Sequence, residues 1–142
     1  MRTVFVQGKK IIVQDEKSWG VVVKEVKKIL LPGMILTLQG PLGAGKTTFV
    51  QAFAKDVGIE KNIVSPTFSL MRSYILPKRV KGIKRIIHVD AYRIENEKDM
   101  LALDLSEELA DNMSILFIEW PENISRWVSQ YAGLVLCIEI RL

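Results

Sequence analysis

The chain has 142 residues, of which 49% are hydrophobic and 25% are charged, which predicts one folded domain over residues 1–142 rather than a disordered chain. It carries no apolar run of the roughly 18 residues that a membrane span needs, and its start does not resemble a secretory signal, so we expect a cytoplasmic protein with no membrane partner. The single cysteine, Cys137, excludes an internal disulfide and a cysteine-based zinc cluster, and a net charge of +4 is compatible with an anionic ligand or RNA without deciding between them.

The first third of the chain predicts a hairpin, a helix and a buried strand. Short apolar runs at 3–6 and 10–13 flank Gly8 and predict the hairpin. Asp15 is a typical N-cap, and the helix after it should end at Pro32-Gly33. Its apolar face has helical spacing: Trp19, Val22, Val23, Val26, Ile29 and Leu30. Residues 34–38 then form an apolar run typical of a buried strand.

The remaining elements alternate between helices and strands. We expect a helix over about 46–57, capped by Gly58, and a second helix over about 97–110. Strands are predicted at 67–75, 85–90, 114–118 and 134–142, with a basic loop at 76–84 between the first two of these. The pattern predicts an α/β fold of layers around a central sheet. Part of that sheet should be antiparallel, because two of the strands follow one another with no helix between them.

A glycine-rich stretch follows the strand at 34–38 directly. Gly40-Pro-Leu-Gly-Ala-Gly-Lys-Thr47 matches the full P-loop (Walker A) pattern, and an amphipathic helix comes after it. Gly43 and Gly45 allow the backbone to curl close to phosphates, and the amides of residues 43–48 point inward with the helix N-terminus. Lys46 should reach the β- and γ-phosphates, and the Thr47 hydroxyl should ligate Mg²⁺. Gly43, Ala44, Gly45, Lys46, Thr47 and Thr48 are therefore the predicted nucleotide-binding residues.

Two carboxylates are candidates for holding Mg²⁺ or orienting a water molecule. Glu119 follows the apolar run 114–118, so it should emerge where that strand ends, and ligands bind at this edge of α/β sheets. Asp90 ends the strand at 85–90, and the period of two places His88, Asp90 and Tyr92 on the same side. Either acid is also typical of a helix cap or a solvated strand end, and a histidine on a strand is commonly a structural residue.

The segment Val64-Ser-Pro-Thr-Phe68 lies after the P-loop helix. Ser65 and Thr67 carry hydroxyls that would sense a γ-phosphate, as switch loops do. A Ser-Pro turn before a strand is the alternative interpretation. The chain has no Asn-Lys-x-Asp guanine motif, which favours adenine as the base.

Four blocks together resemble the TsaE (YjeE) family in order and spacing: Gly40 to Thr48, Ser65-Pro-Thr-Phe68, His88-Val-Asp-Ala-Tyr-Arg93 and Ile118-Glu-Trp-Pro-Glu122. The resemblance implies a P-loop NTPase-like three-layer fold and a weak, partner-stimulated ATPase with ATP and Mg²⁺ as cofactors. It also implies a requirement for threonylcarbamoyladenosine formation at position 37 of tRNAs that read ANN codons. The implied partners are TsaB and TsaD, and any tRNA contact would be indirect.

The resemblance also carries residue roles onto this chain. It implies Lys46, Asp90 and Glu119 as catalytic residues and Thr47, Asp90 and Glu119 as metal ligands. Trp120 would lie beside the nucleotide. The sequence leaves open which of the two acids binds the metal directly, and which residues contact adenine.

Two other functions remain open from the sequence. In a small-molecule kinase, the basic segment 78–85 would be a lid over the phosphates. The same segment is also open to interpretation as a solvated loop or as a contact with tRNA. A non-hydrolysing nucleotide switch would use residues 65–68 to recruit a partner.

Overall fold

The computed structural model describes residues 1–66 and 69–142, with the backbone alone at Leu101, Ala102 and Ala132. The strands and α-helices in chain order are β1 Arg2–Val6, β2 Lys9–Val13, α1 Glu16–Ile29, β3 Ile35–Gln39, α2 Lys46–Asp56, β4 Met71–Val80, β5 Ile83–Asp90, α3 Leu105–Leu109, β6 Ser114–Glu119, α4 Ser125–Ser129 and β7 Val135–Arg141. Three 3₁₀ helices complete them: η1 Glu97–Leu103, η2 Pro121–Ile124 and η3 Ala132–Leu134. None of the helices formed by the described residues is long and apolar enough to cross a membrane.

The strands form one mixed sheet in the order β2-β1-β7-β3-β6-β5-β4. The four central strands β7, β3, β6 and β5 are parallel, and β1 runs antiparallel to β7 while β4 runs antiparallel to β5. The prediction of a mixed, partly antiparallel sheet in an α/β fold is confirmed. The carboxyl ends of the four parallel strands meet at one edge, which is where ligands bind in such sheets.

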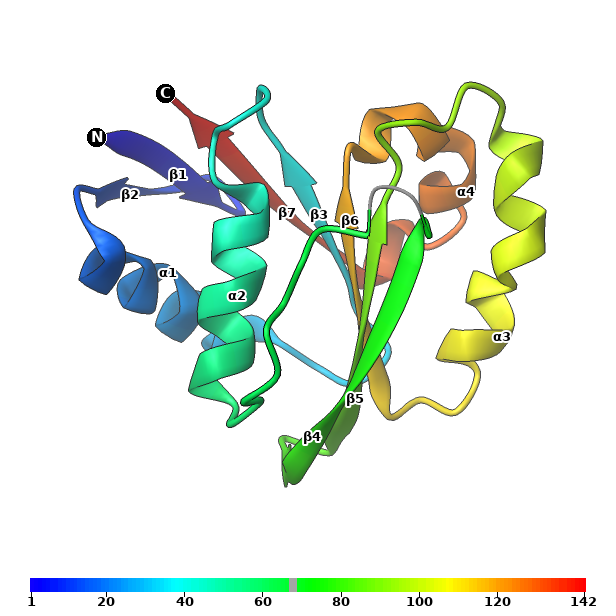
Figure 1. The fold of residues 1–142 in the computed structure, drawn as a ribbon, viewed down its shortest axis with the longest axis horizontal. Helices are drawn as coiled ribbons and strands as arrows, with labels where there is room; N and C mark the ends of the chain where they lie inside the picture. The colour runs from blue at the N-terminus through cyan, green and yellow to red at the C-terminus, as the bar shows by residue number, and fades with distance from the viewer. Residues whose placement is uncertain (67–68) are drawn as a thin grey trace.

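Helices cover both faces of the sheet, which gives three layers (Figure 1). Helices α1 and α2 lie on one face, and α3 and α4 lie on the other. Strand β6 alternates between the two cores: Phe117 packs toward α1 and α2, and Leu116 packs in the opposite core. Such a strand is apolar along its whole length because both faces are buried.

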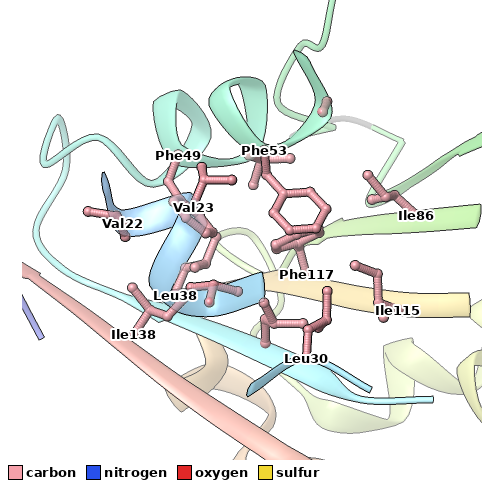
Figure 2. Close-up of a cluster of buried hydrophobic side chains, with 14 of the residues drawn as sticks. Val22, Val23, Leu30, Leu38, Phe49, Phe53, Ile86, Ile115, Phe117 and Ile138 are labelled. Carbon is pink, nitrogen blue, oxygen red and sulfur yellow. The ribbon is translucent and has the colours of Figure 1, made fainter. Parts of the chain in front are cut away.

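The core under α1 and α2 is built around aromatic rings (Figure 2). The Phe53 and Phe117 rings lie edge to face with centroids 5.1 Å apart, and Phe49 packs against Phe117 at 5.9 Å. Phe49 and Phe53 come from α2, so this packing fixes the helix that begins at the glycine-rich loop. The first turn of α2 is thereby held against the edge of the sheet.

Helix α1 begins and ends as predicted. The Ser18 backbone N–H donates to Asp15 Oδ1 at 2.9 Å, which confirms Asp15 as the N-cap. The buried face consists of Trp19, Val22, Val23 and Val26. Leu30 is buried as the C-cap, but the prediction of Ile29 on this face is wrong, because Ile29 lies in the last turn and is 41% exposed.

The basic loop predicted at 76–84 is wrong, because most of it is strand. Strands β4 and β5 form a hairpin that closes with Val80 opposite Ile83. Lys81 and Gly82 have φ of 53° and 82°, the two positive values that a tight type I′ turn requires. The polar residues hid the strand because β4 is an edge strand with one solvated side. The start of the strand predicted at 67–75 lies at Thr67 and Phe68, outside the described residues.

The prediction of one continuous helix at 97–110 is also wrong. The segment is divided into η1 and α3, which meet at Asp104, a residue with φ of 47°. A left-handed residue interrupts the helical hydrogen bonding, and the apolar spacing on its two sides does not reveal it.

Candidate functional site

The predicted site residues gather at the edge where the parallel strands end. The loop after β3 leads into α2, Glu119 ends β6 and Asp90 ends β5. Leu38 pairs with Glu119 and Glu119 pairs with Asp90 in neighbouring parallel strands. The register therefore places the two acids beside the glycine-rich loop.

The loop depends on glycine at two positions for different reasons. Gly43 and Gly45 have φ of 77° and 112°, which side chains rarely allow. A Cβ at Gly45 would lie 2.8 Å from Cζ2 of Trp19, whereas a Cβ at Gly43 would meet no atom within 4 Å. Trp19 is a buried residue of α1, so α1 packs against the loop and leaves no space for a side chain at Gly45.

Lys46 is the first residue of α2 and is only 5% exposed. Its Nζ donates to the carbonyl oxygens of Gly40 at 2.6 Å and Pro41 at 3.0 Å, and it lies 3.9 Å from the centre of the Trp120 ring. Burial lowers the pKa of this amino group below the usual lysine value. Nearby carboxylates oppose that shift in the pKa: Glu119, Glu122 and Asp90.

Glu119 accepts hydrogen bonds from two side chains. The Thr47 hydroxyl donates to Oε1 at 3.0 Å and to Oε2 at 2.9 Å, and His88 Nε2 lies 2.6 Å from Oε2. The Nδ1 atom of His88 is buried and has no hydrogen-bond partner among the described residues. Because a carboxylate oxygen accepts hydrogen bonds, Nε2 is the donor in the contact with Glu119.

Asp90 is held on its own side of the site by residues of two loops. Ser65 Oγ donates to Oδ2 at 2.7 Å, and the backbone N–H of Tyr92 donates to Oδ1 at 3.0 Å. Ser65 belongs to the predicted switch segment, of which Thr67 and Phe68 lie outside the described residues. The structure therefore joins the described part of that segment to the acid at the end of β5.

Trp120 follows Glu119 in a left-handed conformation, with φ of 59°. Its ring lies 5.0 Å from the ring of Tyr92, and the Asn123 side chain donates to the Ala91 carbonyl at 2.9 Å. The left-handed conformation of Trp120 ends the direction of strand β6 and places the indole ring over Lys46. Trp120 therefore forms part of the wall of the site.

A pocket of about 390 Å³ lies between these groups, within the range of small-molecule sites. Every predicted nucleotide-binding residue, both predicted acids and Trp120 line it, together with Leu42, Ser65 and Tyr92. Arg2 lines it too, and sequence reasoning missed it. No motif marks Arg2, since only the pairing of β1 with β7 brings it to this edge.

The donors present suit Mg²⁺ bound together with phosphate. The described residues contain no group of three or more His, Cys, Asp or Glu side chains that would hold a metal ion alone. The Thr47 hydroxyl and the Glu119 carboxylate lie within hydrogen-bonding distance of one another, and both carry oxygen atoms of the kind that Mg²⁺ binds. Mg²⁺ prefers one or two such protein ligands and takes the rest from phosphates and water.

A glycine-rich loop between a buried parallel strand and a helix, with a buried lysine and an acid on the next strand, defines a P-loop nucleotide-binding protein. The sequence model of the family described as "Threonylcarbamoyl adenosine biosynthesis protein TsaE" matches residues 13–141. The chain belongs to the TsaE family.

Individual relatives agree with that family. The tRNA threonylcarbamoyladenosine biosynthesis protein TsaE of Treponema pallidum is 34% identical over 118 residues, which cover 83% of this chain and 80% of that protein. The protein of the same name from Bacillus subtilis is 38% identical over 99 residues, 70% of this chain and 58% of that protein, so the match spans less than two thirds of its length. The crystal structure of Bacillus subtilis YdiB has a TM-score of 0.59 and 25% identity, and covers 89% of this chain and 69% of that one.

Proposed function

We propose that this chain, as one P-loop domain over residues 1–142, binds ATP with Mg²⁺ and hydrolyses it weakly in tRNA threonylcarbamoyladenosine biosynthesis. The modification would be at position 37 of tRNAs that read ANN codons, and TsaB and TsaD would be the partners that stimulate hydrolysis. The family and the names of the relatives support the pathway. The geometry of the pocket supports the chemistry.

The phosphates of ATP would bind where the chain concentrates donors. The amides of residues 43–48 lie at the start of α2, whose N-terminus carries partial positive charge. Lys46 would exchange its bonds to the Gly40 and Pro41 carbonyls for phosphate oxygens. Its lowered pKa reflects a buried cation, and a polyphosphate would compensate that burial.

The contact between Thr47 and Glu119 is the observation that carries the proposal. It places a hydroxyl of the phosphate loop and a buried carboxylate of the adjacent strand around one point at the pocket wall. Thr47 and Glu119 would hold Mg²⁺ there, and the ion would supply positive charge that stabilises the phosphates during the reaction. Glu119 would also orient the attacking water.

In the proposed reaction the water oxygen bonds to the γ-phosphorus, and the bond from that phosphorus to the β–γ bridging oxygen breaks. ADP and phosphate leave, and the proton from water goes to Glu119 or to the phosphate. His88 would hold Glu119 through Nε2, and Asp90 would hold the loop at Ser65 close to the γ-phosphate. Among the described residues, Asp90 and Glu119 are the carboxylates that line the pocket.

The hairpin geometry argues against the kinase alternative. The turn at Lys81 and Gly82 begins β5, whereas Asp90 ends it, so the turn lies at the end of the sheet opposite the phosphate loop (Figure 1). The basic segment 78–85 is therefore not placed as a lid over this pocket. A tRNA contact by the same segment stays a hypothesis.

The test is phosphate release from ATP by the purified chain, alone and with purified TsaB and TsaD. Lys46→Ala is the loss-of-site variant, and Lys55→Ala, an exposed lysine on the same helix, is its matched control. Strong stimulation that is lost only in Lys46→Ala supports the proposal. ATP-dependent association with the partners and no phosphate release would instead identify a non-hydrolysing switch.

A further inference from the structure

Arg2 lines the nucleotide pocket although it belongs to none of the motifs. Because β1 runs antiparallel to β7, the start of β1 lies at the edge where the parallel strands end. Figure 1 shows both chain ends on the same side of the sheet as the loop between β3 and α2. Arg2 is the first residue of β1 and lines the pocket with Lys46. The family match begins only at residue 13, so it does not include this residue.

The Arg2 guanidinium is packed against the phosphate loop. The position that a Cβ would take at Gly45 is 3.5 Å from Arg2 Nε and 2.8 Å from the Trp19 ring. Arg2 Nε and the Trp19 ring therefore both lie close to Gly45. Arg2 is half-buried, and its Nε lies on the buried side, beside the backbone that would hold phosphates.

The buried Nε of the same guanidinium lacks an acceptor among the described residues. In the described part of the chain, the two carboxylates of the pocket contact other groups: Glu119 contacts Thr47 and His88, and Asp90 contacts Ser65. A buried donor without an acceptor destabilises the folded state, because the donor has lost its hydrogen bonds to water. An anionic ligand in the pocket would remove this destabilisation and pair the charge.

The sheet order indicates which part of the ligand Arg2 would meet. Glu119 and Asp90 lie on β6 and β5, to one side of β3, and β1 lies on the other side, beyond β7. In the proposed function the terminal phosphate lies next to Glu119 and Asp90. Arg2 is on the other side of β3, so it would lie next to the part of the phosphate chain that is attached to the nucleoside.

We propose that Arg2 binds the phosphate nearest the nucleoside, which makes β1 part of the nucleotide site. This inference rests on the proposed ATP binding. It adds Arg2 to the nucleotide site and states which end of the phosphate chain lies next to Arg2. Arginine suits the role, since its planar fork pairs with two phosphate oxygens at once. ATP and ADP share this phosphate, so Arg2 would contribute equally to the affinity for both.

The test compares ATP and ADP dissociation constants, measured by calorimetry on the untagged chain, for wild type, Arg2→Gln and Arg2→Lys. Lys10→Gln, an exposed residue on β2 with the same change of charge, is the matched control. Arg2→Gln should weaken both nucleotides by the same factor, about ten- to hundred-fold. The dissociation constants of Arg2→Lys should lie between those of wild type and Arg2→Gln. Lys10→Gln should bind both nucleotides as tightly as wild type does.

The outcomes separate this inference from the proposed function. Wild type that binds neither nucleotide would overturn both. Wild-type affinity in Arg2→Gln, or an equal loss in Lys10→Gln, would overturn the role of Arg2 alone. A loss confined to ATP would place Arg2 at the terminal phosphate and contradict its assignment to the nucleoside side. Arg2→Lys keeps the charge, so it provides the answer if Arg2→Gln does not fold.

Discussion

His88 Nε2 lies 2.6 Å from Oε2 of Glu119, and the histidine that makes this contact has no exposed surface. The register of the parallel strands β5 and β6 pairs Glu119 with Asp90 and His88 with Phe117, so His88 reaches Glu119 diagonally between the two strands. Glu119 is thus held from the sheet by His88 and from the phosphate loop by Thr47. The orientation of this carboxylate is determined by two separate elements of the fold.

Glu119→Gln should abolish hydrolysis while the nucleotide still binds. The amide keeps the shape of the side chain and loses the charge that would accept a proton. We expect partner-stimulated phosphate release to fall by about 10²–10⁴-fold. Nucleotide affinity in the absence of Mg²⁺, measured by calorimetry, should stay within about three-fold of wild type, the effect of roughly 0.6 kcal/mol. Hydrolysis at the wild-type rate would contradict the role of Glu119.

His88 should act by positioning Glu119. In His88→Gln the amide nitrogen replaces Nε2 as a donor, whereas His88→Leu removes the donor and keeps an apolar volume. We expect kcat to fall by about ten-fold or more in His88→Leu, the effect of one lost charged hydrogen bond, and to recover partly in His88→Gln. The KM for ATP should change little in either. A change in KM with kcat unaffected would indicate a binding role instead.

Lys46 should make the stability of the protein depend on pH in the alkaline range. Its folded pKa is lowered by burial, so the unfolded chain binds more protons than the folded one in the window below the ordinary lysine pKa of about 10.4. The free energy of unfolding of wild type should therefore rise relative to that of Lys46→Met as the pH rises through that window. Urea denaturation of both proteins at several pH values measures this difference. If the difference in free energy of unfolding between the two proteins stays constant, or if wild type loses stability relative to Lys46→Met as the pH rises, the lowered pKa of Lys46 is ruled out.

The two glycines of the phosphate loop should differ in how much they contribute to stability. Gly43→Ala should destabilise the fold only through the left-handed conformation, by about 1–2 kcal/mol, because the new Cβ meets open space. Gly45→Ala has the same conformational cost and also pushes against the buried Trp19 ring, which adds about 1–3 kcal/mol. Chemical denaturation without nucleotide should show the larger loss for Gly45→Ala. Equal losses would mean that Trp19 moves freely.

Sequence reasoning was most successful where the information is local. The glycine-rich loop and the two acids at strand ends follow from short motifs and from the edge at which parallel strands end. The structure places Lys46, Thr47, Glu119, Asp90 and Trp120 around one pocket, as the motifs predicted. Their catalytic and metal-binding roles stay predictions.

The residue Arg2 and the contacts that sequence reasoning missed depend on pairing between distant segments. Arg2 reaches the pocket through the antiparallel pairing of β1 with β7, and His88 meets Glu119 through the register of β5 with β6. The strand character of residues 76–80 was hidden because an edge strand keeps polar residues on its open side. None of these relationships leaves a pattern within one segment.

The pairing of Thr3 with Arg141 has a consequence for how the protein acquires its site. Strand β1 touches the rest of the sheet only through β2 and β7, so it cannot take its place until the last strand of the chain has been added. Contacts between segments so far apart in sequence form slowly, because a long loop must close before they yield any free energy. A ribosome that has made only the first half of this chain has made the phosphate loop and Arg2, yet the two are not yet joined in one pocket.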